Sequence, residues 1–208
     1  MQIDISGRTA LVCGASEGLG YASANGLAEA GANLVICSRS VDKLETAVAT
    51  LQKQGGEVLG IQTDLTKTGQ IDALASRALE RFGVVDILVN NAGGPPPGTF
   101  DDLSEMDWRD AVDLTLMSAV ELTRRILPGM RAQEWGRIIN IASIGGQWGG
   151  RNQIHYAASK AGLINLTLSL AKLYSKKGIT TNAVSPGLVK TDLVANELKT
   201  SAGKNKVK

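Results

Sequence analysis

Short runs of apolar residues alternate along this chain with longer segments in which apolar residues recur every three or four positions. The short runs contain many β-branched residues and are apolar on both faces, which is typical of parallel strands covered by helices on each side. We expect six strands, at residues 9–13, 33–37, 57–62, 87–90, 137–142 and 180–184. Five helices are expected between them, at residues 18–30, 41–54, 67–82, 106–130 and 152–176.

This repeated alternation of strand and helix predicts an α/β fold. It is the pattern of a Rossmann-type doubly wound parallel sheet with helices on both faces. Ser104, with Asp107 three residues later, predicts a capping box at the start of the fourth helix. Gly55 and Gly178 stand where helices are expected to stop. Because no internal repeat or linker interrupts residues 1–195, we interpret them as a single domain.

The distribution of charge marks off a second region. The net charge is +2, but residues 196–208 contain four lysines and one glutamate, or +3, so that residues 1–195 carry −1. We interpret residues 196–208 as a basic, mobile tail and expect no nucleic-acid partner.

Several classes of protein are disfavoured by the remaining composition. No window reaches the ~18 apolar residues that a membrane span needs, and the N-terminus lacks the apolar core of a signal peptide. The two cysteines, Cys13 and Cys37, fall in apolar strands, and we interpret them as reduced core residues. We therefore expect a cytoplasmic protein with no membrane partner and no metal site.

The first expected strand runs into a glycine-rich loop, GASEGLG at residues 14–20, and a helix follows at once. Glycine allows a tight turn here and lets backbone N–H groups approach a pyrophosphate, whose charge the helix N-terminus stabilises. After the first strand of a βαβ unit, such a loop favours a dinucleotide site over a purely structural turn.

The residues after the second strand bear on the choice between NAD(H) and NADP(H). In dinucleotide folds an acid at this point holds the ribose 2′-hydroxyl, whereas an arginine suits a 2′-phosphate. This chain has Ser38 and Arg39 there and no acid, which favours NADP(H). Glu17 in the glycine loop opposes this choice, because its carboxylate could repel the same phosphate. We give more weight to Arg39 and keep NAD(H) as the alternative cofactor.

Tyr156 and Lys160 lie four residues apart in the last expected helix and therefore share one of its faces. A free tyrosine has a pKa near 10, so that only about one molecule in a thousand is ionised at pH 7. A neighbouring lysine cation, together with a positively charged nicotinamide, should lower the pKa of this phenol. Tyr156 can then donate a proton to a carbonyl oxygen during reduction or accept one during oxidation. Ser143, just after the fifth strand, could hold the same oxygen.

In this combination and order, the chain resembles the short-chain dehydrogenase/reductase family over residues 6–194. The motifs that carry the resemblance are GASEGLG at 14–20, NNAG at 90–93, Ser143, YAASK at 156–160 and PGLVKT at 186–191. Within the family the chain is most similar to 3-oxoacyl-[acyl-carrier-protein] reductases and their relatives.

The resemblance implies roles for particular residues. Ser143, Tyr156 and Lys160 are implied to be catalytic, and Lys160 also to hold the nicotinamide ribose. Asp64 and Leu65 are implied to border the adenine, and Asn90 to line the cofactor cleft. Residues 186–191 are implied to contact the nicotinamide and its phosphates. Motifs and resemblance together therefore give these cofactor-binding residues: Gly14, Ser16, Glu17, Gly18, Leu19, Gly20, Ser38, Arg39, Asp64, Leu65, Asn90, Ala92, Gly93, Tyr156, Lys160, Pro186, Gly187, Val189 and Thr191.

Thr115 departs from the family. Counting from Trp108, it stands where the family has its fourth catalytic residue, an asparagine that helps to hold a water linking the lysine to solvent. A backbone carbonyl could still do this with threonine present. We therefore keep Thr115 among the catalytic residues and expect a weakened or rerouted proton relay.

The C-terminal sequence also departs from the family. After Val194 the family continues through a segment that covers the substrate, another helix and a final strand, which residues 195–208 lack the apolar period to supply. We expect the sheet to lack that C-terminal strand and the sixth strand to have a free edge.

The leading hypothesis is an NADP(H)-dependent reductase that converts a small carbonyl substrate to an alcohol, with 3-oxoacyl thioesters, including acyl-carrier-protein-linked ones, as candidates. One alternative is a non-catalytic dinucleotide-binding or scaffold protein derived from the family. Another is an NAD-linked sugar or polyol dehydrogenase. The apolar surface of the fourth and fifth helices favours a homodimer or homotetramer.

Overall fold

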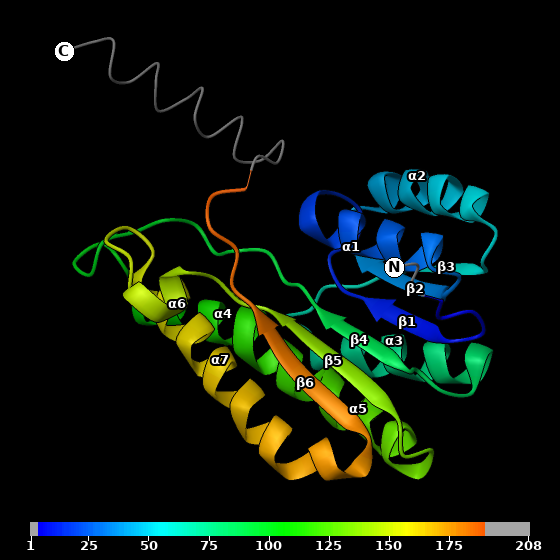
Figure 1. The fold of residues 1–208 in the computed structure, drawn as a ribbon. Helices are drawn as coiled ribbons and strands as arrows, with labels where there is room; N and C mark the ends of the chain where they lie inside the picture. Colours follow the sequence, from blue (N-terminus) through cyan, green and yellow to red (C-terminus); the bar gives the residue numbers. More distant parts are fainter. Residues whose placement is uncertain (1–3, 190–208) are drawn as a thin grey trace.

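The computed structural model describes residues 4–189, which form a six-stranded parallel sheet with helices on both faces (Figure 1). The strand order is β3-β2-β1-β4-β5-β6. Strands β2 and β3 are therefore added outward on one side of β1, and β4 to β6 are added outward on its other side. All six expected strands are confirmed, with ends that differ from the expected ones by no more than one residue. They are β1 (Thr9–Val12), β2 (Asn33–Ser38), β3 (Val58–Gln62), β4 (Ile87–Asn90), β5 (Gly136–Ile141) and β6 (Ile179–Val184).

Seven α-helices connect the strands of the described region: α1 (Gly18–Glu29), α2 (Val41–Leu51), α3 (Thr68–Phe82), α4 (Glu105–Val112), α5 (Ser118–Ala132), α6 (Gly145–Trp148) and α7 (Ile154–Tyr174). The expected capping box opens α4, since the Ser104 side chain accepts from Asp107 N and the Asp107 side chain accepts from Ser104 N. Gly55 and Gly178 follow short 3₁₀ turns with φ of 100° and 74°, in the left-handed region that glycine adopts at low cost.

The fourth expected helix, residues 106–130, is interrupted in the structure. A π-helical turn, η2 (Asp113–Met117), separates α4 from α5. We did not expect this turn, because single π-helical turns are rare and the apolar residues of this segment fit one continuous helix. Thr115 lies within this turn and is buried. The short helix α6 was not expected either.

Two apolar layers bury the sheet, because side chains alternate between its faces along each strand. On one face, Val12 and Ile36 pack with residues of α1 and α2, including Ala24 and Leu44. On the other, Leu11, Val35 and Leu88 pack with residues of α3 and α5, which include Ile71, Leu74, Leu122 and Ile126. Helix α7 packs against β6 and α4. The two layers hold the carboxyl ends of the strands at one edge, as a doubly wound fold requires.

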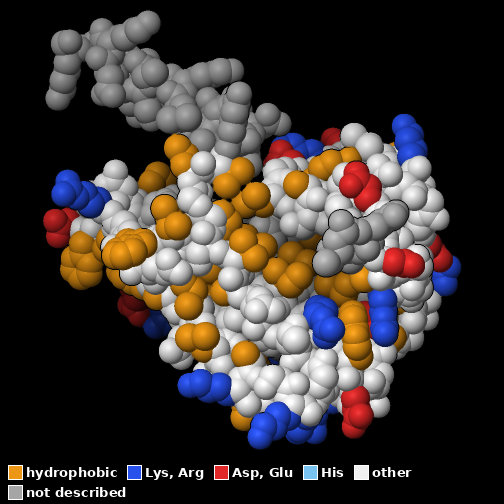
Figure 2. Space-filling view, in the orientation of Figure 1, with side chains coloured by type: hydrophobic (Ala, Val, Ile, Leu, Met, Phe, Trp, Pro, Cys, Tyr) orange, Lys and Arg blue, Asp and Glu red, His pale blue; other side chains and the backbone are white. Residues whose placement is uncertain are grey.

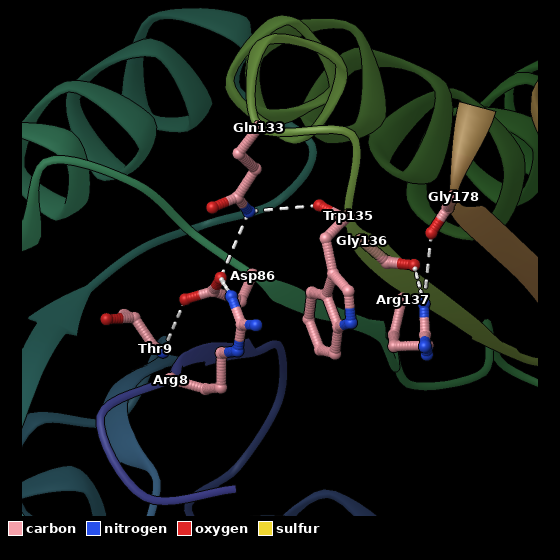
Figure 3. Close-up of polar contacts among 8 residues, drawn as sticks. All are labelled: Arg8, Thr9, Asp86, Gln133, Trp135, Gly136, Arg137 and Gly178. Atoms are coloured by element: carbon pink, nitrogen blue, oxygen red, sulfur yellow. Dashed lines mark hydrogen bonds and ion pairs between the residues drawn. The ribbon is translucent and has the colours of Figure 1, made fainter.

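A polar cluster closes the opposite, amino-terminal edge of the sheet (Figure 3). The buried Asp86 carboxylate accepts from Thr9 N at 2.8 Å, from Arg8 Nη1 at 2.8 Å and from Gln133 Nε2 at 3.0 Å. Beside it the Trp135 ring lies between two guanidinium groups, with Arg8 and Arg137 Cζ 4.0 and 4.2 Å from its centre. These contacts tie β1, β4 and β5 together far from the carboxyl edge.

Strand β6 is the last strand of the sheet in the described region and pairs only with β5 there. Ile179 and Thr181 are buried, whereas Thr180, Asn182 and Val184 are exposed. The sheet thus ends at β6 within residues 4–189, as expected, while the proposed tail at residues 196–208 lies outside the described residues. In that same described region, no helix is long and apolar enough to cross a membrane.

Candidate active site

A cleft of about 770 Å³ opens at the carboxyl ends of the strands, where open α/β sheets bind ligands. Its walls come mainly from the segments that follow the six strands and from the first turns of α7. The structure brings to this cleft many of the residues that the sequence nominated: Gly14, Ser16, Glu17, Gly18, Leu19, Ser38, Arg39, Leu65, Ala92, Gly93, Ser143, Tyr156, Lys160, Pro186 and Gly187.

The glycine loop forms one wall of the cleft. Gly14 and Gly18 have φ of 57° and 60°, which a residue with a side chain adopts only with strain. Gly20 does not line the cleft and has a packing role instead. A Cβ on it would lie 2.1 Å from Gly14 O and 2.6 Å from Asn91 Nδ2. The loop therefore needs glycine at this position so that α1 can begin directly beneath it.

The end of β2 forms the neighbouring wall. The Ser16 and Ser38 hydroxyl groups share a hydrogen bond of 2.9 Å, which joins this wall to the glycine loop. Gln62 Nε2 donates to Arg39 O at 3.1 Å and fixes the backbone there. Arg39 lines the cleft together with Lys43, from the first turn of α2, so the far end of the cleft carries two cationic side chains.

Ser143, Tyr156 and Lys160 come together on the opposite wall, as the sequence predicted. The Lys160 side chain is buried; its Nζ lies 5.5 Å from the centre of the Tyr156 ring and donates to Ile141 O at 2.6 Å. Ser143 hydrogen bonds with the Tyr156 side chain, and Ser143 Oγ accepts from Gly145 N at 3.1 Å. A phenol, a hydroxyl and an ammonium thus face one part of the cleft.

The electrostatics of this group differ from the expectation in one respect. Burial raises the pKa of the Tyr156 phenol, against a smaller lowering by the hydrogen bond from Ser143. Burial also lowers the pKa of Lys160 to about 8. The net shift of the Tyr156 pKa is therefore upward for the residues of the chain alone, which corrects the expectation of a net lowering. The physical reason is that desolvation penalises both charged forms and that Lys160 is directed to a backbone carbonyl.

Asn90 and Asn91 have separate roles that the NNAG motif could not assign. Asn90 is buried behind the cleft, where its Nδ2 donates to Asn140 Oδ1 at 2.8 Å, and Asn140 in turn donates to Thr167 Oγ1. It does not line the cleft. Asn91 does, and its Nδ2 donates to Cys13 O at 3.1 Å and to Gly14 O at 3.3 Å. Asn91 thus holds the glycine loop, while Asn90 links β4 to β5 and, through Asn140, to α7.

Thr115 does not line the cleft but lies behind it, next to Lys160. It lines a small internal cavity of about 10 Å³ together with Lys160 and Asn90, roughly the room that one water molecule requires. Its Oγ1 donates to Ala111 O at 2.5 Å, within its own helix. Asn90 Oδ1 is buried without a hydrogen-bond partner. The structure therefore places Thr115 beside Lys160, with its hydroxyl already engaged.

The other nominated residues lie outside the cleft wall or outside the described region. Asp64 accepts from Thr66 N and Oγ1 in a local turn, and the neighbouring Thr63 lines the cleft instead. Val189 is partly exposed next to the lining residues, and Thr191 lies outside the described residues. Sequence reasoning missed these lining residues: Cys37, Ser40, Lys43, Thr63, Asn91, Leu114, Ile141 and Ala142.

Large exposed apolar side chains occur in the segments that follow β4, β5 and β6. Figure 2 shows apolar side chains gathered on this side of the molecule, toward α6. In these segments Phe100 is 72% exposed, Trp148 86% and Leu188 80%. The segments that follow these three strands therefore carry exposed apolar surface.

Comparison with known proteins identifies the relatives of this chain. Residues 8–202 match the family described as short chain dehydrogenase. The chain is 40% identical over 93% of its length to a granaticin polyketide synthase putative ketoacyl reductase from Streptomyces violaceoruber, of which it covers 72%. It is 36% identical over 92% of its length to a 3-oxoacyl-[acyl-carrier-protein] reductase from a Synechocystis species, of which it covers 78%.

Two solved structures are similar over almost the whole chain. The first is L-sorbose reductase from Gluconobacter frateurii, complexed with NADPH and L-sorbose, with a TM-score of 0.91 and 36% identity. The second is an actinorhodin polyketide ketoreductase with NADPH, with a TM-score of 0.89 and 37% identity. Each alignment covers 96% of this chain, with 78% of the first structure and 77% of the second.

Proposed function

This chain belongs to the short-chain dehydrogenase family, and we propose that it is an NADP(H)-dependent reductase that converts a carbonyl to an alcohol. The observation that carries the proposal is the position of Ser143, Tyr156 and Lys160 on one wall of a cleft whose far end holds Arg39. The walls between them, including the glycine loop, come from the strand ends at which dinucleotides bind in this type of fold.

The residues present fit a dinucleotide. The backbone around Gly20 leaves no room for a Cβ, and within residues 4–189 no side chain caps the N-terminus of α1, which leaves backbone N–H groups for a phosphate. Arg39 offers a planar, charged group to a 2′-phosphate at the end of β2. The NADPH complexes of the two solved relatives support the same cofactor.

The chemistry assigned to the chain's own residues is proton transfer and positioning. A bound reduced nicotinamide would supply the hydride to the carbonyl carbon. Tyr156 donates its proton to the carbonyl oxygen, and Ser143 hydrogen bonds to that oxygen. Lys160, held by Ile141 O, places a cation 5.5 Å from the Tyr156 ring and stabilises the phenolate that remains. A raised pKa keeps Tyr156 protonated before the reaction, as an acid must be.

We propose a 3-oxoacyl thioester, including one linked to acyl carrier protein, as the first candidate substrate. Relatives described as ketoacyl and 3-oxoacyl reductases support it. The exposed apolar side chains in the segments that follow β5 and β6, such as Trp148 and Leu188, offer contacts to an acyl chain. A sugar ketone is the second candidate, which the similarity to L-sorbose reductase favours.

The test is to follow NADPH consumption with acetoacetyl thioesters and L-sorbose, alongside fluorescence titration of NADPH. Turnover that disappears in Tyr156→Phe, with NADPH binding retained, is the expected result. Faster turnover of the thioester would select the first candidate substrate, and faster turnover of L-sorbose the second. Full turnover by Tyr156→Phe would contradict the mechanism. Binding of NADPH without turnover of either substrate would favour a non-catalytic dinucleotide-binding protein.

We further propose that the protein is a homodimer or homotetramer. Leu168 and Leu173 of α7 are 56% and 63% exposed, and Met117 of the π-helical turn is 38% exposed. Apolar side chains on the outer surface of long helices are typical of subunit contacts. Sedimentation of the purified protein over a range of concentrations would measure the state, and a monomer at every concentration would contradict this proposal.

A further inference from the structure

Three charged side chains line the far end of the cleft. Glu17 comes from the glycine loop, Arg39 from the end of β2 and Lys43 from the first turn of α2, and all three line the cleft. Lys43 Nζ donates to Glu17 Oε2 at 2.8 Å, across 26 residues of sequence. This ion pair thus lies at the same end of the cleft as Arg39.

The ion pair has little to do with the stability of the fold. The Lys43 and Glu17 side chains are 56% and 60% exposed, and exposed pairs of this kind contribute about 0–1 kcal/mol. Glu17 stands at the N-cap of α1, but its side chain caps no backbone N–H of that helix. Helix capping therefore does not explain why the glycine loop carries the acidic residue Glu17.

The charges explain what the pair does for a ligand. A phosphomonoester carries about −1.5 to −2 charges at pH 7. Glu17 alone beside Arg39 leaves this end of the cleft with no net charge, so that the carboxylate offsets the attraction of the guanidinium. Lys43 restores a net charge of +1 at the three side chains. Because the ion pair is exposed, it holds this arrangement without a large desolvation cost.

We propose that Lys43 is a specificity-determining residue that offsets the repulsion of Glu17 for the adenosine 2′-phosphate of NADP(H). This inference rests on the proposed use of NADP(H) by the chain. It explains how an acid in the glycine loop is compatible with a 2′-phosphate site, which the sequence alone left as two opposing signals. It also assigns a role to a side chain of α2 that lies outside both the glycine loop and the end of β2.

The test measures dissociation constants for NADPH and NADH by fluorescence titration at low ionic strength, where charge effects are largest. The proteins are the wild type, Lys43→Gln, Glu17→Gln and the double variant. Lys53→Gln, an exposed lysine just after α2 and outside the cleft, is the control for a change in net charge. Unfolding midpoints of all five proteins check that each is folded.

Lys43→Gln is expected to weaken NADPH binding roughly three- to tenfold and to change NADH binding by less than about twofold, as expected for one exposed charge near a phosphate. Glu17→Gln should strengthen NADPH binding. The double variant should recover more than half of the loss seen in Lys43→Gln, measured as the logarithm of the dissociation constant, because the two charges it removes cancel. Lys53→Gln should change neither constant.

The proposal is overturned if Lys43→Gln leaves NADPH binding unchanged or weakens both cofactors equally. It is also overturned if the double variant keeps more than half of the loss, measured as the logarithm of the dissociation constant, because Lys43 would then act independently of Glu17. Failure of the proposed function is a different result: a wild-type protein that binds NADPH no better than NADH.

Discussion

Lys160 lies beneath Tyr156 with its ammonium 5.5 Å from the centre of the phenol ring, but it donates its hydrogen bond to Ile141 O. Lys160 is therefore held through its ammonium by the backbone at the end of β5 and not by a hydrogen bond to Tyr156. Because its side chain is only 2% exposed, its charge is costly in the folded protein, and its pKa falls to about 8. The proposed catalytic lysine therefore lowers the stability of the folded protein while it is charged.

The first prediction concerns stability and pH. Below about pH 8 Lys160 is protonated in both states, and the folded state bears the cost of the buried cation. Between about pH 8 and 10.5 the unfolded chain binds more protons, so the free energy of unfolding should rise with pH because of this group, by on the order of 2–3 kcal/mol. Urea unfolding of the wild type and Lys160→Met at pH 7 and 10 measures the difference.

Lys160→Met should be more stable than the wild type at pH 7, and this advantage should shrink toward pH 10. Other titrating groups affect both proteins alike, so the comparison isolates Lys160. An equal pH dependence in the two proteins would mean that the lysine is not desolvated as described.

The second prediction concerns the packing of the glycine loop. In Gly20→Ala the new methyl group would meet Gly14 O and Asn91 Nδ2, so the loop must move. We expect a loss of about 1–3 kcal/mol of unfolding free energy together with weaker NADPH binding. Gly26→Ala is the matched control in the same helix, since its Cβ would contact nothing within 4 Å. Because alanine favours the helix, Gly26→Ala should be neutral or stabilising. Similar losses of unfolding free energy in Gly20→Ala and Gly26→Ala would contradict the packing argument.

The third prediction compares how much the hydroxyl groups of Thr115 and Ser143 contribute to kcat. The Thr115 hydroxyl donates to Ala111 O in its own helix, whereas Ser143 hydrogen bonds with Tyr156 in the cleft. Ser143→Ala should lower kcat about a hundredfold or more, as the loss of a hydrogen-bond donor to the reacting oxygen does. Thr115→Val should lower kcat less than about tenfold, because a proton relay through a backbone carbonyl does not need this hydroxyl. A comparable loss in both variants would show that the hydroxyl itself carries protons.

The fourth prediction addresses the amino-terminal edge of the sheet. Asp86→Asn replaces an acceptor of three hydrogen bonds by an amide that also donates, and Asp86 is only 2% exposed. We expect a loss of about 2–4 kcal/mol of unfolding free energy, with kcat per folded molecule unchanged. Asp72→Asn, which removes the more exposed partner of Arg125, is the control and should cost under about 1 kcal/mol. A fall in kcat for Asp86→Asn would link this edge to the cleft.

The sequence could predict the fold because its strands are apolar on both faces and its helices have a clear period. The sequence could also predict that Ser143, Tyr156 and Lys160 come together, since Tyr156 and Lys160 share a helix face and Ser143 follows the end of a strand. Lys43 was not, because its position against Glu17 depends on how α2 packs beside the glycine loop. The NNAG motif could not show which asparagine faces the cleft, because neighbouring side chains at a strand end point in opposite directions.

Two of the three tryptophans of the chain occupy contrasting settings, so that their fluorescence can report on different parts of the molecule. Trp135 is clamped between Arg8 and Arg137 at the edge remote from the cleft, whereas Trp148 is 86% exposed at the end of α6. Emission from Trp135 alone, in a variant without the other two indoles, would follow loss of the native sheet. Emission from Trp148 alone would follow events at the surface around α6, so that unfolding of the sheet and changes at α6 can be recorded as separate signals.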